Sequence, residues 1–278
     1  MMMNFVRTDA VVLRHWDYSD SSLIVSLYTK MRGKIRFMVK GAKTPKSPFR
    51  GMFEHFNFLQ IQFDFHPAKK GLYYIKQARV EQSFRIAGGA LESFYMASYM
   101  LELVEVLTEE HDADIRIFAL MVEAFEVLRL QWAVKGPGDS NEGTNHYTGF
   151  DLMVHRFELY LLHLLGFLSI DENCHICHNA LSGKILLEHA TGRVLCVPCA
   201  RKRASLEFSS QEPSYHQRGY AMLDIGVLGF AQMLMDTPWD QLANQTVSLA
   251  QRGQIKRFTG IYIDLHLSKP LKSRKFLD

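Results

Sequence analysis

The sequence of 278 residues predicts an α+β protein: a five-stranded β-barrel of the oligonucleotide-binding (OB) type, followed by an α-helical domain with an inserted four-cysteine zinc ribbon. Strand-like runs of β-branched and aromatic residues occupy residues 8–80, and apolar residues take helical spacing from residue 90 onward. All four cysteines lie between Cys174 and Cys199. The predicted domains are an OB-fold nucleic-acid-binding domain at 1–82 and a helical domain at 83–278, with the zinc finger at 171–203.

The overall composition is that of an ordinary globular protein, with 47% hydrophobic and 22% charged residues. The N-terminus has no apolar run of signal-peptide length, and the most apolar later segment, 150–170, carries Asp151, Arg156 and Glu158. We therefore expect a soluble cytoplasmic protein with reduced cysteines and no membrane partner.

Three strands are predicted before residue 41. The first two, at 10–13 and 22–28, are separated by the turn formers of 17–21. Gly33 then allows a reversal into 34–40, where one parity holds Ile35, Phe37 and Val39 and the other holds Lys34, Arg36, Met38 and Lys40. Because alternate residues of a strand point to opposite faces, this strand should have one core face and one basic face.

Two further strands complete the predicted barrel after an exposed loop at 42–50, in which two prolines interrupt regular structure. The fourth strand, 55–65, changes the parity of its apolar residues at Phe58 and Leu59, which indicates a β-bulge there or a strand that is apolar on both faces. The fifth runs from Leu72 towards Val80. Five short strands that end at a helical region are typical of a small closed OB-type barrel.

Positive charge is concentrated at one place in the chain, although the formal net charge is only +3. The segment from 30 to 50 has eight basic residues and no acidic one. A basic strand face that continues into a flexible basic loop favours single-stranded nucleic acid bound through phosphates, with strong salt dependence. A merely solvated charged surface is the alternative. The predicted DNA-binding residues are Lys30, Arg32, Lys34, Arg36, Lys40, Lys43, Lys46 and Arg50, with Trp16, Tyr28 and Phe49 as candidate base-stacking groups.

The helical part is predicted from apolar residues spaced three and four apart. The first two helices, near 91–105 and 115–125, are also acidic, and a flexible loop follows at 135–145. The most apolar helix, 150–168, should lie at the centre of the domain. Two later helices are expected near 217–235 and 247–267, and a basic tail closes the chain.

The cysteines give the strongest single motif. Cys174-His-Ile-Cys177 and Cys196-Val-Pro-Cys199 are two Cys-x-x-Cys pairs separated by eighteen residues, a spacing typical of a zinc site. Four thiolates form a closed tetrahedral shell with no open position for chemistry, so we expect one structural zinc ion. The segment 184–195 between the pairs should form a hairpin too small to be stable without the metal.

Three other interpretations of these cysteines remain open. Cys174 to His178 also fits the Cys-x-x-Cys-His pattern of covalent haem attachment, which would leave the second pair unexplained. Disulfides would require an oxidising compartment. A catalytic zinc would use three protein ligands and water, with His175, His178 and His189 close in sequence.

No recognisable catalytic motif accompanies the zinc pattern. The sequence has no nucleophile elbow, phosphate-binding glycine loop or His-Glu-x-x-His motif. We expect a protein that is not an enzyme. Two alternatives are a protein-interaction adaptor without intrinsic DNA activity, which uses its acidic and apolar helices, and a zinc-dependent nucleic-acid hydrolase.

Several short segments together resemble the RecO family of bacterial DNA repair proteins. The N-terminal ones are Ala10-Val-Val-Leu-Arg14, Asp17-Tyr18, Tyr28-Thr-Lys30, Gly33-Lys34, Val39-Lys-Gly-Ala-Lys43 and Pro45-Lys-Ser47. The resemblance continues through the cysteine pairs to Lys269-Pro-Leu-Lys-Ser-Arg274 and so covers nearly the whole chain. The chain departs from the family pattern in its long 135–145 loop and in Asp20, where the family commonly has Glu.

The resemblance implies a recombination mediator in DNA repair. Proteins of this family bind single- and double-stranded DNA, anneal complementary strands and, with RecR, help to load RecA on DNA coated by single-strand binding protein. They have no catalytic residues, and some lack the cysteines, so zinc is not expected to take part in the activity itself. RecR, single-strand binding protein and, indirectly, RecA are thus the implied partners, in a cytoplasmic, nucleoid-associated protein.

Overall fold

The computed structural model describes most of the chain as two compact units. The described residues are 4–66, 71–84, 91–134, 150–168, 170–207, 219–242, 245, 247–267 and 269–276. One unit comprises Met1–Glu142 and Leu271–Asp278, and the other comprises Gly143–Pro270. The loop expected at 135–145 lies outside the described residues.

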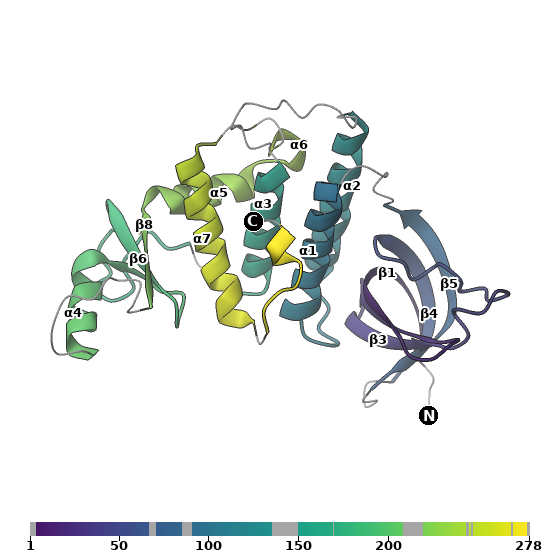
Figure 1. Cartoon of the computed structure of the whole chain (residues 1–278). Helices are drawn as coiled ribbons and strands as arrows, with labels where there is room; N and C mark the ends of the chain where they lie inside the picture. Colours follow the sequence, from purple (N-terminus) through teal and green to yellow (C-terminus); the bar gives the residue numbers. More distant parts are fainter. Residues whose placement is uncertain are drawn as a thin grey trace. The chain divides into compact units, whose positions relative to one another are not determined.

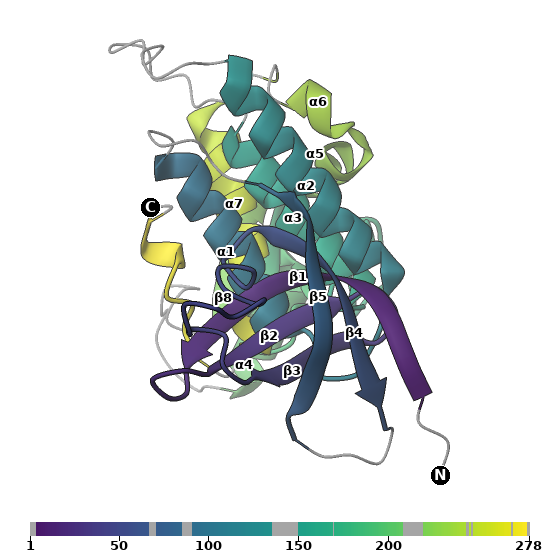
Figure 2. The same ribbon diagram turned by 90° about the vertical axis from the view of Figure 1, so that its right-hand side faces the viewer.

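The first unit contains a closed five-stranded barrel (Figures 1 and 2). Its strands are β1 (Asn4–Asp17), β2 (Leu23–Thr29), β3 (Gly33–Val39), β4 (Asn57–Phe65) and β5 (Tyr73–Ser83). They pair in the order β1-β2-β3-β5-β4 and close back onto β1, with only the β3–β5 pair parallel. This connectivity is that of the predicted OB-type barrel.

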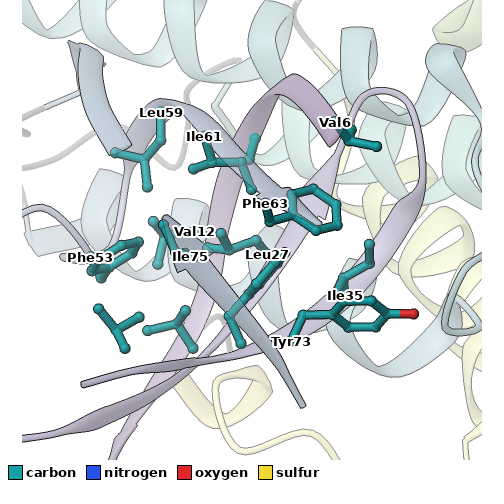
Figure 3. Packing of buried hydrophobic residues seen from close by; sticks show 14 of the residues in the cluster. Val6, Val12, Leu27, Ile35, Phe53, Leu59, Ile61, Phe63, Tyr73 and Ile75 are labelled. Atoms are coloured by element: carbon teal, nitrogen blue, oxygen red, sulfur yellow. The ribbon is translucent and has the colours of Figure 1, made fainter. Parts of the chain in front are cut away.

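Alternation along the strands fills the barrel with apolar side chains. Ile35, Phe37 and Val39 are all buried, as the parity of β3 predicts. Figure 3 shows Leu27 and Phe63 among the side chains of this interior cluster. The predicted bulge is confirmed, because the β4–β5 register shifts between Phe58 and Leu59. The first strand is longer than expected, since one end of β1 pairs with β4 and the other with β2.

Two helices belong to the same compact unit as the barrel, namely α1 (Leu91–Leu107) and α2 (Ile115–Val134). Phe58 of β4 packs against Phe118 and Phe125 of α2, with ring centroids 6.2 and 6.1 Å apart. The boundary expected between residues 82 and 83 falls at the last residue of β5. The compact units nevertheless divide the chain further on, because the barrel buries aromatic rings against these helices.

The second unit combines helices with a small sheet. Its helices are α3 (Phe150–Leu164), α4 (Val197–Glu207), α5 (Gly226–Asp236), α6 (Trp239–Leu242) and α7 (Leu249–His266), and its strands are β6 (Lys184–Glu188), β7 (Val194–Cys196) and β8 (Tyr220–Asp224). As expected, α3 is central, with contacts to α5, α6 and α7. A short 3₁₀ helix, η2 (Arg274–Phe276), ends the described chain and belongs to the first unit.

Arg156 and Glu158 of α3 are charged side chains buried within the unit. Arg156 donates from Nη1 to the carbonyl oxygens of Leu234 and Met235, both at 2.6 Å, at the C-terminal end of α5. Its guanidinium lies 4.8 Å from the ring centroid of Trp239. A buried cation at these carbonyls complements the negative end of the α5 dipole and fixes α5 against α3.

The prediction of a helix at 217–235 is wrong for the first residues of that range. Tyr220–Asp224 is the strand β8, paired antiparallel with β6, and the helix starts only at Gly226. Ala221, Met222 and Leu223 are good helix formers, so local preference favoured a helix. The backbone of β6 supplies hydrogen bonds for a third strand, and this tertiary pairing overrides the preference.

No helix in the described part of the chain combines the length and the hydrophobicity needed to cross a membrane.

Candidate nucleic-acid interface and metal centre

Lys34 does not lie on an exposed basic face, contrary to the prediction. The residue is 5% exposed, and its Nζ donates to the carbonyl oxygens of Glu105 and Thr108 at the end of α1. Burial lowers the pKa of Lys34 below its ordinary value. A phosphate cannot reach this ammonium group, so Lys34 has a structural role and leaves the set of candidate DNA contacts.

Residues around Lys34 show why the expected basic face of β3 is covered. On the neighbouring strand β2, Ser26 donates to Glu105, and Tyr28 donates from its hydroxyl to the carbonyl oxygen of Asp114 at 3.2 Å. Burial raises the pKa of Tyr28 to about 12. OB folds commonly bind oligonucleotides over strands 2 and 3. Here the end of α1 and the α1–α2 connection occupy that face.

Three other predicted basic residues form ion pairs within the first unit. Arg36 Nε lies 3.1 Å from the Glu110 carboxylate, Lys43 Nζ lies 3.1 Å from Asp17, and Lys30 Nζ lies 4.0 Å from Asp9. All six side chains are at least one-third exposed. Such surface pairs are weak and exchange readily, so these cations can still contact a polyanion.

Three of the remaining four predicted residues are more open to an external phosphate. Lys40, Lys46 and Arg50 are exposed on the connection between β3 and β4, whereas Arg32 is half-buried against the Phe65 ring. Lys40 Nζ lies 5.1 Å from the ring centroid of Tyr74 on β5. The accessible positive charge therefore centres on residues 40–50 rather than on the face of β3.

The structure also changes the set of aromatic candidates for base stacking. Tyr28 is fully buried, and its hydroxyl is engaged, so it cannot stack on a base. Phe49 and Trp16 are half-buried. Among the tyrosines that the structure describes, the most exposed are Tyr18, at 62%, and Tyr74, at 52%. Sequence reasoning missed both, although the outward parity of Tyr74 beside the inward-facing Tyr73 could have identified it.

The four cysteines converge on one point in the second unit, as predicted. The four sulfur atoms of Cys174, Cys177, Cys196 and Cys199 all lie within 4.8 Å of one another. Cys174 and Cys177 lie on the loop before β6, Cys196 ends β7, and Cys199 is in the first turn of α4. The hairpin of β6 and β7 delivers the second pair to the first.

Backbone amides fix the loop from Cys174 to His178 and polarise the Cys174 sulfur. The amide of His178 donates to the carbonyl of Cys174 at 2.8 Å, and the amide of Cys196 donates to the Cys174 sulfur at 3.3 Å. Burial alone would raise the pKa of Cys174, but amide donors from Cys177, Cys196 and Ile176 lower it to about 6. This sulfur is thus prepared to be a thiolate at neutral pH.

Cys196 and Cys199 resist ionisation in the absence of a cation. Burial raises the pKa of Cys196, and its neighbouring thiols raise that of Cys199 to about 12. Four sulfurs in a tetrahedral-sized cluster, with one already favoured as a thiolate, suit a single divalent metal ion with soft ligands. The residues present therefore fit one structural metal ion.

The geometry argues against two of the other interpretations of the cysteines, haem attachment and a catalytic zinc site. Haem attachment would use one pair only, whereas both pairs converge. His175, His178 and His189 are exposed, and among the described residues the sulfur cluster is the one group arranged to hold a metal ion. A three-ligand catalytic site built from these histidines is not formed.

Comparisons with known proteins extend over nearly the whole chain. Residues 3–84 match the family description "Recombination protein O N terminal", and residues 146–275 match "Recombination protein O C terminal". The chain is 26% identical over 276 residues to the DNA repair protein RecO of Pelotomaculum thermopropionicum, covering 99% of this chain and 94% of the relative. It is 26% identical over 283 residues to that of an Anaeromyxobacter species, covering 100% and 97%. A RecO protein of Salinibacter ruber is 36% identical over 127 residues, covering 46% of this chain and 48% of the relative.

Proposed function

The chain belongs to the recombination protein O family and so has a role in DNA repair and recombination; we propose that it performs this role by binding DNA and annealing complementary strands. The proposal includes both single- and double-stranded DNA. It assigns the protein no catalytic step: the barrel holds strands by their phosphates, and base pairing supplies the free energy of annealing.

One observation carries this proposal, namely the exposed basic connection at 40–50 on a closed OB-type barrel. Lys40, Lys46 and Arg50 extend from it, with Lys43 beside them. Lysines and arginines on a rigid barrel bind phosphates with little sequence preference. An annealing protein needs this property, because it must accept any pair of complementary sequences.

The family membership also supports a proposal about partners. We propose that the protein acts with RecR to promote RecA loading on DNA coated by single-strand binding protein. These partners come from the resemblance, and no contact residues for them are assigned. The metal is proposed to be zinc, held by the four cysteines as a structural ion, because a closed four-thiolate shell has no open position for substrate.

Annealing of complementary oligonucleotides tests the proposed function. The double variant Lys40→Glu/Lys46→Glu removes two exposed cations and is expected to slow annealing at least about tenfold, since each phosphate contact contributes to affinity. The matched control, Arg257→Glu/Lys269→Glu, makes the same charge change at exposed positions of the second unit. It is expected to retain near-normal annealing.

Equal rates for wild type and the Lys40/Lys46 variant would refute annealing through this surface. A wild-type protein with no detectable binding to any oligonucleotide would instead favour the adaptor function. Thermal unfolding and metal content of both variants should match the wild type, because neither pair of residues contributes to the barrel core or the sulfur cluster.

A further inference from the structure

A pocket of about 270 Å³ opens beside the basic connection of the first unit. It is formed where β1 ends, β2 begins and the β3–β4 connection passes over them. Its volume is near the lower end of the range for small-molecule sites, about 300–1,000 Å³. The lining residues are His15, Asp17, Leu23, Ala42, Lys43, Arg50, Gly51, Phe53 and Glu54.

Two cationic side chains line this pocket, and polar contacts fix the position of one of them. Lys43 Nζ lies 3.1 Å from Asp17 and 3.3 Å from the carbonyl oxygen of Ser19. Arg50, on the β3–β4 connection, also lines the pocket and is exposed. An ammonium fixed by two oxygens retains a third hydrogen to donate, and a guanidinium has five. Both groups can donate to phosphate oxygens.

The interior of the pocket offers planar groups and a polar atom without a partner. His15 Nδ1 is buried and has no hydrogen-bond partner among the described residues. The His15 ring lies 5.0 Å from the ring of His55, whose pKa is lowered by burial and by His15. Imidazole rings can stack on bases, and buried Phe53 adds an apolar wall.

The pocket also contains acceptors that can read the edge of a base. Asp17, which pairs with Lys43, and Glu54 are among its lining residues. Carboxylates accept hydrogen bonds from the amino group of cytosine, whereas thymine presents a carbonyl oxygen at the corresponding position. A mixture of phosphate donors, planar rings and base-edge acceptors in one pocket of this size is the recognition chemistry of a single nucleotide.

We propose that this pocket binds one unstacked nucleotide of single-stranded DNA. Its phosphate lies against Lys43 and Arg50, its base contacts His15 and Phe53, and an amino-bearing edge faces Glu54. The proposal rests on the proposed DNA-binding function and adds a site at which the protein binds a single base. It predicts a modest base preference on top of binding that otherwise depends only on phosphates.

Equilibrium binding to three strands of equal length and charge tests the site: oligo(dC), oligo(dT) and a deoxyribose-phosphate strand without bases. We expect oligo(dC) to bind about five- to tenfold more tightly than oligo(dT), and the strand without bases to bind weakest. In Glu54→Ala the preference for dC over dT should disappear. In His15→Ala the difference between strands with and without bases should shrink.

Lys46→Ala provides the matched control, because Lys46 is an exposed cation of the same connection that does not line the pocket. It should weaken binding to all three strands by the same factor. Wild-type binding that is equal for all three strands would overturn the pocket but leave the DNA-binding proposal intact. No binding to any strand would contradict the DNA-binding proposal itself.

Photo-cross-linking of the wild type keeps the test independent of the folding of variants. An oligo(dC) with 5-iodocytosine should cross-link to the lining residues His15, Phe53 or Glu54, and excess unmodified oligo(dC) should suppress the product. Cross-links confined to Tyr18 or Tyr74, the exposed rings outside the pocket lining, would overturn the proposal.

Discussion

At the scale of the residue, Lys34 shows how a single buried charge changes the expected interface. Strand parity correctly separated Lys34 from the core side chains of β3, but parity cannot tell a face open to water from one covered by another element. Two carbonyl oxygens at the end of α1 attract the ammonium group. These acceptors are about seventy residues away in sequence, so no local pattern could reveal them.

Replacing Lys34 with Met should therefore lower the free energy of unfolding without affecting DNA binding. The change leaves two buried carbonyl groups without their donor, which costs about 1–3 kcal/mol. Urea unfolding at pH 7.5 measures the loss. Unchanged stability together with reduced oligonucleotide affinity would contradict the structural role.

The pH dependence of unfolding gives a second readout of the same lysine. Burial lowers the pKa of Lys34 below 10.5, so the unfolded chain binds more protons in the window between the folded value and 10.5. Wild-type stability should thus rise, relative to Lys34→Met, as the pH increases through that window. A relative fall over this window would mean that the charge is favoured in the folded state.

Glu102 of α1 is a residue whose role is to hold the C-terminal segment. Its carboxylate accepts from the backbone amides of Lys272 and Ser273, at 3.0 and 2.8 Å, and from the Ser273 hydroxyl. Burial opposes ionisation, but these donors keep the pKa of Glu102 below 4.5. The stabilisation is present above pH 4.5 and is lost as the pH falls through the lower, folded-state value.

Glu102→Gln should release residues 271–276 from the first unit. The neutral amide forms weaker hydrogen bonds, and its NH₂ group faces the same donors, so a loss of roughly 1–2 kcal/mol is expected locally. Hydrogen exchange of the C-terminal peptide should become faster in this variant. Glu109→Gln, at an exposed position after α1, serves as the control and should leave that exchange unchanged. Equal protection in Glu102→Gln and wild type would contradict the anchoring role.

At the scale of the element, the sequence predicted the four cysteines of the metal-binding ribbon correctly but missed one of its strands. The spacing of Cys174 to Cys199 specifies two knuckles, and Thr191-Gly192 specifies the turn between β6 and β7. The third strand, β8, joins from residues 220–224. Short segments of Ala, Met and Leu favour a helix locally, and only the open edge of β6 selects a strand.

Removal of one sulfur ligand should destabilise the ribbon before it affects DNA binding. Cys174→Ser or Cys196→Ser is expected to reduce bound zinc below one per chain and to lower stability by at least about 3 kcal/mol, a fraction of the ~10–16 kcal/mol of structural zinc binding. His175→Ala, an exposed position between two of the cysteines, should retain the metal. A cysteine variant that is fully folded but unable to bind DNA would contradict a purely structural metal.

At the scale of the whole molecule, the sequence predicted the barrel, the helical part and the grouping of the four cysteines, but not the division into compact units. Composition changes at about residue 83, where strands give way to helices. The compact units instead follow tertiary burial: Phe118 and Phe125 pack on Phe58, and Leu271–Asp278 returns to the first unit. Such long-range packing is not encoded in local periodicity.

The covered strand face also changes where DNA is expected to bind on this barrel. With residues 105–114 over β2 and β3, the accessible cations are concentrated on the β3–β4 connection. The salt dependence of binding reports this arrangement directly, because each phosphate contact to single-stranded DNA adds about 0.7 to the slope of log affinity against log salt.

A salt titration of single-stranded oligonucleotide binding is the most direct test of the central claim. Wild type should show a steep negative slope, and Lys40→Glu/Lys46→Glu should lower its magnitude by about 1.4, two contacts at ~0.7 each, while Lys34→Met leaves it unchanged. A slope that is the same in wild type and in Lys40→Glu/Lys46→Glu, or one that falls in Lys34→Met instead, would contradict DNA binding by the 40–50 connection.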